Sequence, residues 1–106
     1  MSRILVVEDN EQSRYMLQQL LQSKGHRIDS AENGEEALQL ARRDPPDVIV
    51  SDIMMPVMNG FRLCREVKND PGLKQLPFIF YTATFVDEAD ERLVRSMGAS
   101  RFIVKP

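Results

Sequence analysis

Short apolar runs alternate along the chain with longer segments whose apolar residues recur at helical spacing. Residues 4–7 form a fully apolar run, as expected of a β-strand that is covered on both faces. Similar runs follow at 48–51, 78–81 and 102–104, each shortly after a proline or a glycine. The segment 26–31 is short and polar, so we interpret it as a strand at the edge of a sheet.

The segments between these strands predict helices, because their apolar residues lie three or four positions apart. Breakers end each helix: Gly25 the first, Pro45-Pro46 the second, the segment 69–72 the third and Gly98 the fourth. The apolar residues that we expect to face the core are Met16, Leu17, Leu20, Leu21, Ala37, Leu38, Leu40, Ala41, Phe61, Cys64, Val67, Ala89, Leu93, Val94 and Met97.

The alternation of strands and helices is typical of an open, parallel α/β sheet with right-handed crossovers. A chain that starts mid-sheet, moves out to the polar strand and then doubles back has the strand order 2-1-3-4-5. We therefore predict a single doubly wound, five-stranded domain over residues 1–106.

The predicted strand order places the first helix alone on one face of the sheet and the other three on the opposite face. A fifth helix after Pro106 would join the first. We expect a domain that is truncated after Pro106 and lacks this helix, with apolar surface exposed near strand 102–104.

The composition excludes several classes of protein. A net charge of −2 and a pI of about 5.4 lack the basic excess of a nucleic-acid surface. No apolar stretch suits a membrane helix, and the first apolar run is too short for a signal peptide, so we expect a cytoplasmic protein. The single cysteine, Cys64, excludes an internal disulfide and is expected to be a small buried hydrophobe. Solvated helix faces are expected to carry Arg42, Arg43, Arg62 and Arg65.

Three carboxylates follow strands that we expect to be neighbours. Glu8 and Asp9 come directly after the first strand, and Asp52 follows the third. The strand order reverses between these two strands, which is where open α/β sheets bind ligands. Converging carboxylates repel each other, so a bound cation is the simplest explanation, and oxygen ligands favour Mg²⁺ or Mn²⁺. The alternative is that these are unrelated surface acids, with Asp9 or Asn10 capping the first helix.

Two further strand ends belong to the same rim of the sheet. Thr82 follows strand 78–81 and offers a hydroxyl group, and Ala83 leaves space beside it. Lys105 follows the last strand and brings an ammonium group. A metal, a carboxylate, a hydroxyl and a cation are the groups needed to place and stabilise a phosphoryl group during its transfer.

These residues, in this order and spacing, resemble the receiver domains of two-component response regulators over the whole length of the chain. The residues that carry the resemblance are the apolar run 4–7 with Glu8-Asp9-Asn10, the segment 52–60 (DIMMPVMNG), Thr82-Ala83, and the segment 102–106 (FIVKP).

The resemblance implies a flavodoxin-like fold and a phosphorylation-dependent signalling switch. Asp52 would accept a phosphoryl group from a histidine kinase, a histidine phosphotransfer domain or acetyl phosphate, forming an aspartyl phosphate. Glu8, Asp9 and Asp52 would bind Mg²⁺ together with the backbone carbonyl of Met54. The domain would catalyse only its own phosphorylation and dephosphorylation, and would not be an enzyme otherwise.

The resemblance also implies how the switch works. Thr82 and Lys105 would each contact a phosphoryl oxygen, and Thr82 would move inward so that Phe102 rotates into the vacated space. The surface of the fourth helix and fifth strand would then change and control an output domain or a partner protein. The Lys105–Pro106 bond would be cis. The cognate kinase, the output and a possible homodimer remain open.

Two residues depart from the commonest family pattern. Glu8 forms a Glu-Asp pair where many members have Asp-Asp, although the family uses both. Phe102 stands where many members carry Tyr, so an outward hydrogen bond from a hydroxyl group is lost. We further expect that Met54 and Thr84, which flank the site, tune dephosphorylation by admitting or excluding water.

Other classes of protein fit the sequence less well. A receiver-like module that is never phosphorylated would normally have lost an essential residue. An aspartate-nucleophile phosphatase usually carries a second acid two residues after the nucleophile, where this chain has Met54. A flavin-binding electron carrier has a phosphate loop rich in Ser, Thr and Gly, whereas Glu8-Asp9 would repel phosphate without a metal.

The loop 53–60 is unusually apolar for a loop. Pro56 is expected to stiffen it, and Gly60 allows the third helix to begin. Met55, Val57 and Met58 either pack under the loop or form part of a kinase-docking face, and the sequence alone leaves both open.

Overall fold

Five strands and four helices alternate along the part of the chain that the computed structural model describes, residues 2–82 and 88–104, without the side chains of residues 90 and 91. The elements are β1 (Arg3–Val7), α1 (Glu11–Ser23), β2 (Arg27–Ala31), α2 (Gly34–Arg43), β3 (Val48–Ser51), α3 (Gly60–Asn69), β4 (Phe78–Thr82), α4 (Glu88–Ser96) and β5 (Arg101–Val104). Every predicted strand is present, and the predicted strand ends are right to within one residue.

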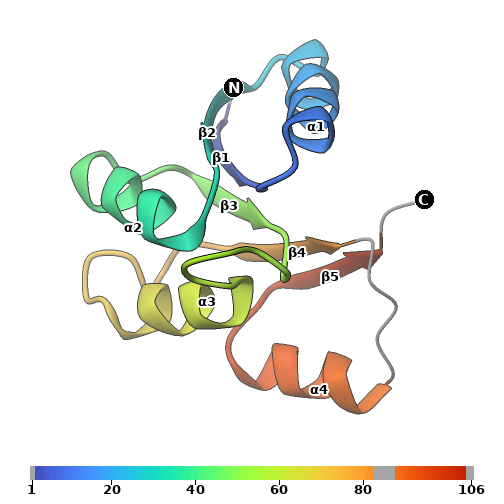
Figure 1. Ribbon diagram of the computed structural model, residues 1–106. Coiled ribbons are helices and arrows are strands. Elements are labelled where there is room, and N and C mark those ends of the chain that lie inside the picture. The colour runs from blue at the N-terminus through green and yellow to red at the C-terminus, as the bar shows by residue number, and fades with distance from the viewer. Residues whose placement is uncertain (1, 83–87, 105–106) are drawn as a thin grey trace.

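The strands form one parallel sheet in the order β2-β1-β3-β4-β5, which confirms the predicted topology (Figure 1). β1 is paired on both sides, so that Ile4 lies opposite Ile28 of β2 and Val48 of β3. The polar strand β2 is at one edge, as its composition predicts. β2 begins one residue later than expected. The N–H of His26, where we expected the strand to start, donates instead to the carbonyl of Leu21 in the last turn of α1.

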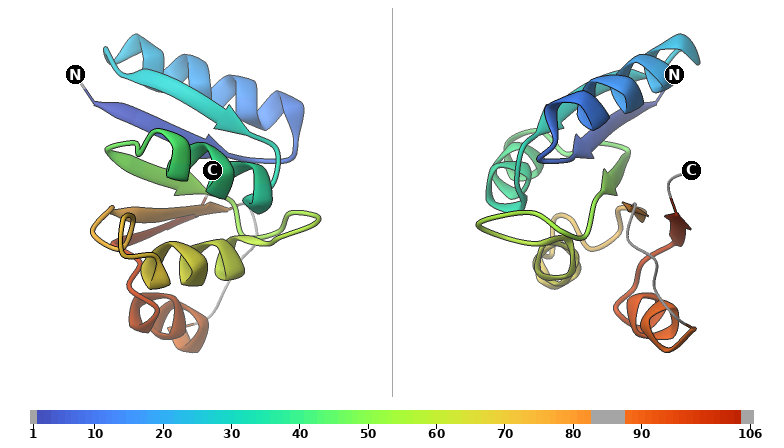
Figure 2. Two further views of the ribbon diagram at one scale, coloured as in Figure 1. Left: turned by 90° about the vertical axis from the view of Figure 1, so that its left-hand side faces the viewer. Right: turned by 45° about the vertical axis from the view of Figure 1, so that its right-hand side comes forward.

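The two faces of the sheet are covered unequally. In Figures 1 and 2, α1 lies on one side of the sheet, and α2 and α3 lie on the other. Successive side chains of a strand point to opposite faces. Leu5 and Val7 of β1 accordingly belong to the main hydrophobic core, while Ile4 and Val6 are buried outside that cluster.

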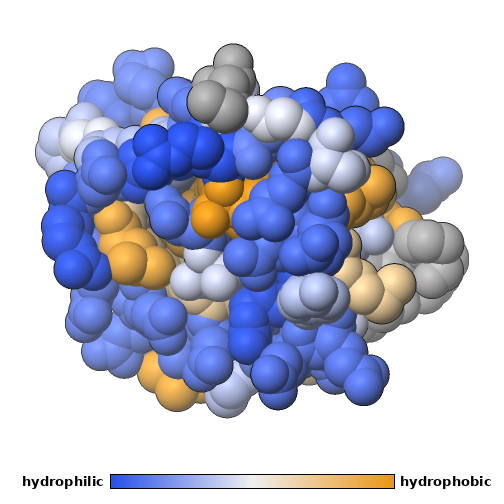
Figure 3. All heavy atoms as spheres, turned by 90° about the horizontal axis from the view of Figure 1, so that it is seen from above, coloured by the Kyte–Doolittle hydropathy of each residue, from blue (hydrophilic) through white to orange (hydrophobic). Residues whose placement is uncertain are grey.

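The helix α1 contributes no fully buried residue. Of the four apolar residues predicted to face the core, Leu17 and Leu21 are partly buried, whereas Met16 is 71% exposed and Leu20 is also exposed, so the prediction is wrong for these two. Figure 3, which views the molecule from the side of α1, shows hydrophobic patches within a mostly hydrophilic surface.

The strand β5 leaves apolar side chains at the surface, as we expected for this edge of the sheet. Ile103 and Val104 are both exposed. The truncation of the domain after Pro106 and the helix expected beyond it stay predictions.

The helices α3 and α4 face the core with a slightly different set of residues from the predicted one. Leu63, Cys64 and Val67 are fully buried in α3, and Phe61 is only partly buried. In α4 the prediction is right for Val94 and wrong for Leu93, which is 56% exposed, and for Ala89, which is also exposed. No helix within the described residues is both long and apolar enough to cross a membrane.

Candidate functional site

The carboxyl ends of β1, β3 and β4 lie at the same level of the sheet. The register pairs Val7 with Ser51, and Ser51 with Phe80. The next residue of each strand or loop therefore emerges at one rim, and for β1 and β3 these residues are Glu8 and Asp52. The predicted convergence of the carboxylates follows from this register.

Glu8, Asp9 and Asp52 lie together at this rim. One carboxylate oxygen of each lies within 4.8 Å of those of the other two. Glu8 is buried, Asp52 is partly buried and Asp9 is exposed. Carboxylates this close repel one another, and burial weakens the screening by water. All three donors are oxygens, which suits a hard divalent cation such as Mg²⁺. The residues present therefore fit the predicted metal site.

The Glu8 backbone is fixed by neighbouring elements. Its N–H donates to the carbonyl of Ala31 at the end of β2 (3.0 Å). Its carbonyl accepts from the Nη1 of Arg14 in α1 (2.9 Å), and the Nη2 of Arg14 pairs with Glu32 at 3.6 Å. Arg14 was not singled out from the sequence, and it ties α1 to the rim.

The capping of α1 falls to Asn10 rather than Asp9. The side-chain oxygen of Asn10 accepts from the N–H of Ser13 at 2.9 Å. Asn10 thereby satisfies a donor at the start of the helix that has no partner within it. Of the two capping candidates named from the sequence, the structure selects Asn10, and the Asp9 carboxylate lies with the acidic cluster.

Asp52 is held at the rim by its backbone. Its N–H donates to the carbonyl of Val7 (2.9 Å), and its Oδ1 accepts from the N–H of Ile53 (2.7 Å). Its carbonyl accepts from the hydroxyl of Ser51, which is fully buried (2.7 Å). Ser51 was also missed from the sequence, since serine at a strand end is common and carries no specific signal.

The loop after β3 is packed tightly against the ends of two helices. A Cβ atom on Gly60 would lie 2.2 Å from the carbonyl oxygen of Asp52, and one on Gly34 would lie 2.6 Å from the carbonyl oxygen of Met58. The N–H of Gly34 donates to that same carbonyl at 3.1 Å. Glycine at both positions lets the loop close on α2 and α3. The role of Gly34 became visible only in three dimensions.

The apolar residues of this loop divide into two groups. Ile53 and Met58 are buried, and Met55 packs partly against the core. Met54 and Val57 are exposed. The loop is therefore apolar mainly because it is anchored to the core. The proposed role of the Met54 carbonyl in metal binding stays a prediction.

Val57 has an unusual backbone conformation. Its φ is 67°, and it is the only non-glycine residue with positive φ in the described ranges 2–82 and 88–104. The N–H of Met58 donates to the carbonyl of Pro56 at 2.7 Å, so the three residues form a γ-turn. Positive φ is costly for a β-branched residue, which marks this turn as strained.

Thr82 and Phe102, the two predicted switch residues, lie on neighbouring strands. Thr82 is fully buried at the end of β4 and pairs in register with Val104 of β5. Phe102 is partly buried, and its ring centroid lies 6.4 Å from that of Phe80. Both residues thus lie close to the core side of the rim. Ala83, Thr84, Lys105 and the Lys105–Pro106 bond lie outside the described residues.

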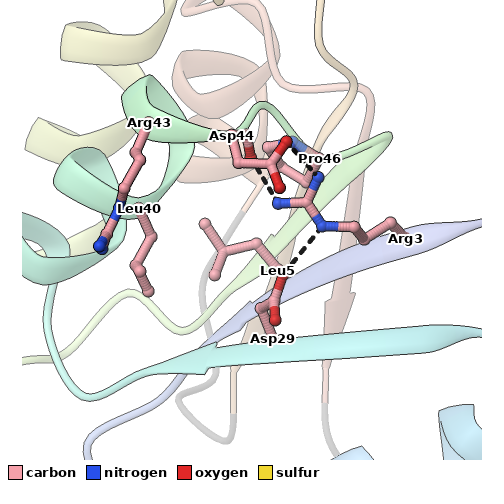
Figure 4. Close-up of a pocket in the computed structure, with 7 residues that line it drawn as sticks. All are labelled: Arg3, Leu5, Asp29, Leu40, Arg43, Asp44 and Pro46. Carbon is pink, nitrogen blue, oxygen red and sulfur yellow. Dashed lines mark hydrogen bonds and ion pairs between the residues drawn. The ribbon is translucent and has the colours of Figure 1, made fainter.

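A separate cavity of about 490 Å³ lies at the opposite end of the sheet (Figure 4). Arg3 bridges it, with its Nε donating to Asp29 at 2.9 Å and its Nη1 pairing with Asp44 at 3.0 Å. The hydrogen bond to Asp29 raises the pKa of Arg3 above its ordinary value. The backbone N–H of Arg3 also donates to Asp47 at 2.7 Å. Arg3 therefore joins β1, β2 and the α2–β3 connection, which is a structural role.

The chain is similar to known proteins over its whole length. Residues 4–106 match the family described as response regulator receiver domain. Protein PilH of Pseudomonas aeruginosa is 38% identical over 106 residues, which make up 100% of this chain and 87% of PilH. Response regulator PleD of Caulobacter vibrioides is 40% identical over 106 residues, and the match covers 99% of this chain but 23% of PleD.

Solved structures show the same fold. The chemotaxis response regulator CheY4 of Vibrio cholerae has a TM-score of 0.92 at 33% identity, covering 100% of this chain and 88% of CheY4. Response regulator TrrA of Thermotoga maritima, in complex with Mg²⁺-BeF, has a TM-score of 0.88 at 35% identity, covering 100% of this chain and 88% of TrrA.

Proposed function

Because this chain belongs to the response regulator receiver domain family, we propose that it is a phosphorylation-dependent signalling switch with Asp52 as the phosphoacceptor. The observation that carries the proposal is the convergence of Glu8, Asp9 and Asp52 within 4.8 Å at one rim of the sheet. The Asp52 backbone N–H donates to the carbonyl of Val7, and its carboxylate Oδ1 accepts from the N–H of Ile53, so both the backbone and the carboxylate of Asp52 are held in place. A fixed carboxylate is suited to in-line attack on a phosphorus atom.

The proposed reaction transfers a phosphoryl group to the Asp52 carboxylate. A carboxylate oxygen forms a bond to phosphorus while the bond from phosphorus to the donor breaks. With a phosphohistidine donor, the imidazole nitrogen leaves with the electron pair. The donor would be a histidine kinase or a histidine phosphotransfer domain, and acetyl phosphate would serve as a small-molecule substitute.

Glu8, Asp9 and Asp52 would hold Mg²⁺, or Mn²⁺, together with the Met54 carbonyl. When bound, such a cation neutralises negative charge on the phosphoryl oxygens. The all-oxygen donor set supports this assignment. The complex of the related TrrA with Mg²⁺-BeF supports it independently.

Thr82, Lys105 and Phe102 would convert phosphorylation into a change of surface. Thr82 and Lys105 would each contact a phosphoryl oxygen, and Phe102 would fill the space that Thr82 leaves. The burial of Thr82 and its position on the strand next to Phe102 support this coupling. The phosphoryl group would stabilise one of two pre-existing conformations.

The domain would act through partners rather than as an enzyme. Its own chemistry would be limited to autophosphorylation and autodephosphorylation. We expect it to work in the cytoplasm and to control an output domain or a downstream protein, with or without a homodimer. Direct contact with nucleic acid or membrane is not part of the proposal.

The main alternative is a receiver-like interaction module that is not phosphorylated in the cell. An aspartate-nucleophile phosphatase is less well supported, because Met54 occupies the position where its general acid would stand. The exposed side chain of Met54 cannot protonate a leaving group.

Incubation with acetyl phosphate and Mg²⁺, followed by intact mass spectrometry, tests the proposal. We expect one phosphoryl group on the native chain and none on the Asp52→Asn variant. Arg43→Gln, which leaves the rim untouched, serves as a matched control and should be labelled like the native chain. Equal labelling of the native and Asp52→Asn proteins would refute the assignment.

A further inference from the structure

A groove of about 690 Å³ lies between α3 and α4, and it runs along α3 from Asn59 to Asn69. In the left-hand view of Figure 2, α4 (orange) lies below α3 (yellow). Two contacts join them: the Sγ of Cys64 lies 4.0 Å from the carbonyl oxygen of Met97, and a Cβ atom on Gly98 would lie 3.3 Å from the methylene groups of Lys68. Both contacts involve the turn that follows α4, so this turn packs against α3 and the groove lies between the two helices.

The floor of the groove is apolar. Phe61 of α3 lines one side, and Leu93 of α4 and Met97, the residue that follows α4, line the other. Leu93 and Met97 are four residues apart, and the N–H of Met97 donates to the carbonyl of Leu93 at 3.1 Å, so the two side chains lie on the same side of this segment. The Phe61 ring is supported from beneath by Phe80, with ring centroids 5.7 Å apart. Leu93 is 56% exposed, whereas Phe61 and Met97 are partly buried, so Leu93 is the part of the floor that the described residues leave most open.

The α3 side of the groove is cationic. Arg62 and Arg65 are three residues apart on α3, and both are exposed. Among the residues that the structure describes, no carboxylate pairs with either guanidinium group. They stand out in a chain whose net charge is −2. The solvated face expected from the sequence is thus one wall of a groove.

Lys68 has a different role at the end of the groove. Its ammonium group donates to the carbonyl of Leu76 at 2.7 Å and to that of Lys74 at 3.3 Å. The lysine is therefore committed to the α3–β4 connection. The cations available to a ligand are Arg62 and Arg65.

From this arrangement we infer that the α3–α4 groove docks an acidic amphipathic helix of a partner protein. Apolar side chains of that helix lie against Phe61, Leu93 and Met97, and its flanking carboxylates pair with Arg62 and Arg65. The thioether of Met97 adapts to apolar groups of different shape. α3 is ten residues long, or about 15 Å at 1.5 Å per residue, so the groove matches three turns of a bound helix.

The charge and apolarity of the groove together favour a peptide over a phosphate polymer. Nucleic-acid affinity rises with the number of phosphates that cations neutralise, and only two guanidinium groups are available. The exposed Leu93 and the partly buried Met97 suit aliphatic anchors instead.

Fluorescence anisotropy with labelled peptides of about 15 residues, several helical turns long, tests the inference. The probe peptide carries Leu along one face and Glu on its flanks. A second peptide has the same composition in an order that destroys the apolar face, and a third has Lys in place of Glu. We expect the probe to bind the native chain at least tenfold more tightly than either control peptide.

Two variants and a matched control locate the binding site. R62E/R65E and Leu93→Ser should each weaken probe binding at least tenfold, and R62E/R65E should gain affinity for the Lys peptide. K24E/R43E makes the same change in net charge at exposed positions outside the groove and should bind the probe as the native chain does. Thermal melting checks that each variant is folded, and R62Q/R65Q replaces the double reversal if it is not.

Four results would overturn the inference, three from the binding measurements and one from NMR. The first is equal binding of the ordered and scrambled peptides, which would indicate nonspecific charge attraction. The second is unchanged binding by R62E/R65E, or an equal loss in K24E/R43E. The third is the absence of binding to the native chain at millimolar peptide. Amide chemical-shift changes should fall on α3 and α4, and changes centred on another surface would count equally against it.

Discussion

A Cβ atom on Gly60 would lie 2.2 Å from the carbonyl oxygen of Asp52. The first residue of α3 is thus pressed against the backbone of the proposed phosphoacceptor, and only a hydrogen atom fits between them. The Gly60 N–H also donates to the carbonyl of Ile53 at 2.8 Å, so this contact closes the loop. Any side chain at position 60 must displace Asp52 from Glu8 and Asp9.

Gly60→Ala should therefore destabilise the fold and impair phosphorylation. We expect a loss of about 2–4 kcal/mol in the free energy of unfolding, because the obstructing atom is backbone and cannot rotate away. Urea unfolding measures this loss, and acetyl phosphate labelling should be slower. Gly72→Ala is the matched control, since its Cβ would meet only Asp70 at an ordinary 3.4 Å. Equal stability of the two variants would contradict the argument.

Val57→Asn should stabilise the protein. Asn tolerates positive φ better than a β-branched residue, and Val57 is 70% exposed, so little apolar burial is lost. We expect a gain of about 0.5–1 kcal/mol, measured by urea unfolding. Met54→Asn changes another exposed apolar residue of the same loop that lacks positive φ, and it should give no gain. A loss of stability in Val57→Asn would show that the γ-turn is not strained.

Much of the fold could be predicted from the sequence because its signals are local. The apolar runs and their breakers located all five strands, and the polarity of β2 indicated the edge. The helix faces were less certain. Periodicity places Leu20 beside Leu17 and Leu93 beside Met97, which are both partly buried, but the exposure of each residue depends on which neighbours cover that face, and this is a tertiary property.

Some residues of the candidate site could likewise be predicted from the sequence, and others could not. Glu8, Asp9 and Asp52 were predictable because parallel strands bring their carboxyl ends to one rim. Arg14 and Gly34 were not, because their roles depend on contacts between segments far apart in the chain, with Glu32 and Met58 respectively. The groove between α3 and α4 was equally invisible, since it requires knowing how two helices are spaced.

Cys64 should react slowly with thiol reagents. It is fully buried, and burial raises the pKa of its thiol to about 11. Because the neutral form is favoured in the fold, this group's stabilising contribution falls as the pH rises from about 9 towards 11. At pH 8 we expect labelling of the folded chain to be at least 100-fold slower than in urea. Cys64→Ala combined with Met16→Cys exposes a thiol on α1 as a control. Similar labelling rates for the two folded proteins would contradict the burial of Cys64.

Asp70 should titrate below the ordinary range of an aspartate. The hydrogen bond from Arg42 is the main cause of its lowered pKa, and the N–H of Gly72 adds to it. The charged form is favoured in the fold, so this interaction stabilises the protein above the unfolded pKa and is lost as the pH falls through the folded one. NMR titration of the Asp70 carboxyl carbon should show a higher pKa in Arg42→Gln and no change in Arg43→Gln. An unchanged pKa in Arg42→Gln would assign the shift to the backbone alone.

Asp9→Asn should separate metal binding from the intrinsic stability of the rim. In a metal-free buffer the three clustered carboxylates repel one another, so removing one charge should stabilise the fold by about 0.5–1 kcal/mol. The same change removes a metal ligand, so Mg²⁺ should raise the melting temperature of the native chain but not that of the variant.

Melting with and without 10 mM Mg²⁺, a concentration of the order used for weak sites, measures both effects. Glu88→Gln is the control, because it alters an exposed acid outside the cluster, and it should behave like the native chain. Asp47→Asn is less suitable, because the backbone N–H of Arg3 donates to that carboxylate. An equal response to Mg²⁺ in Asp9→Asn would remove this residue from the metal site and leave Glu8 and Asp52 as the candidate ligands.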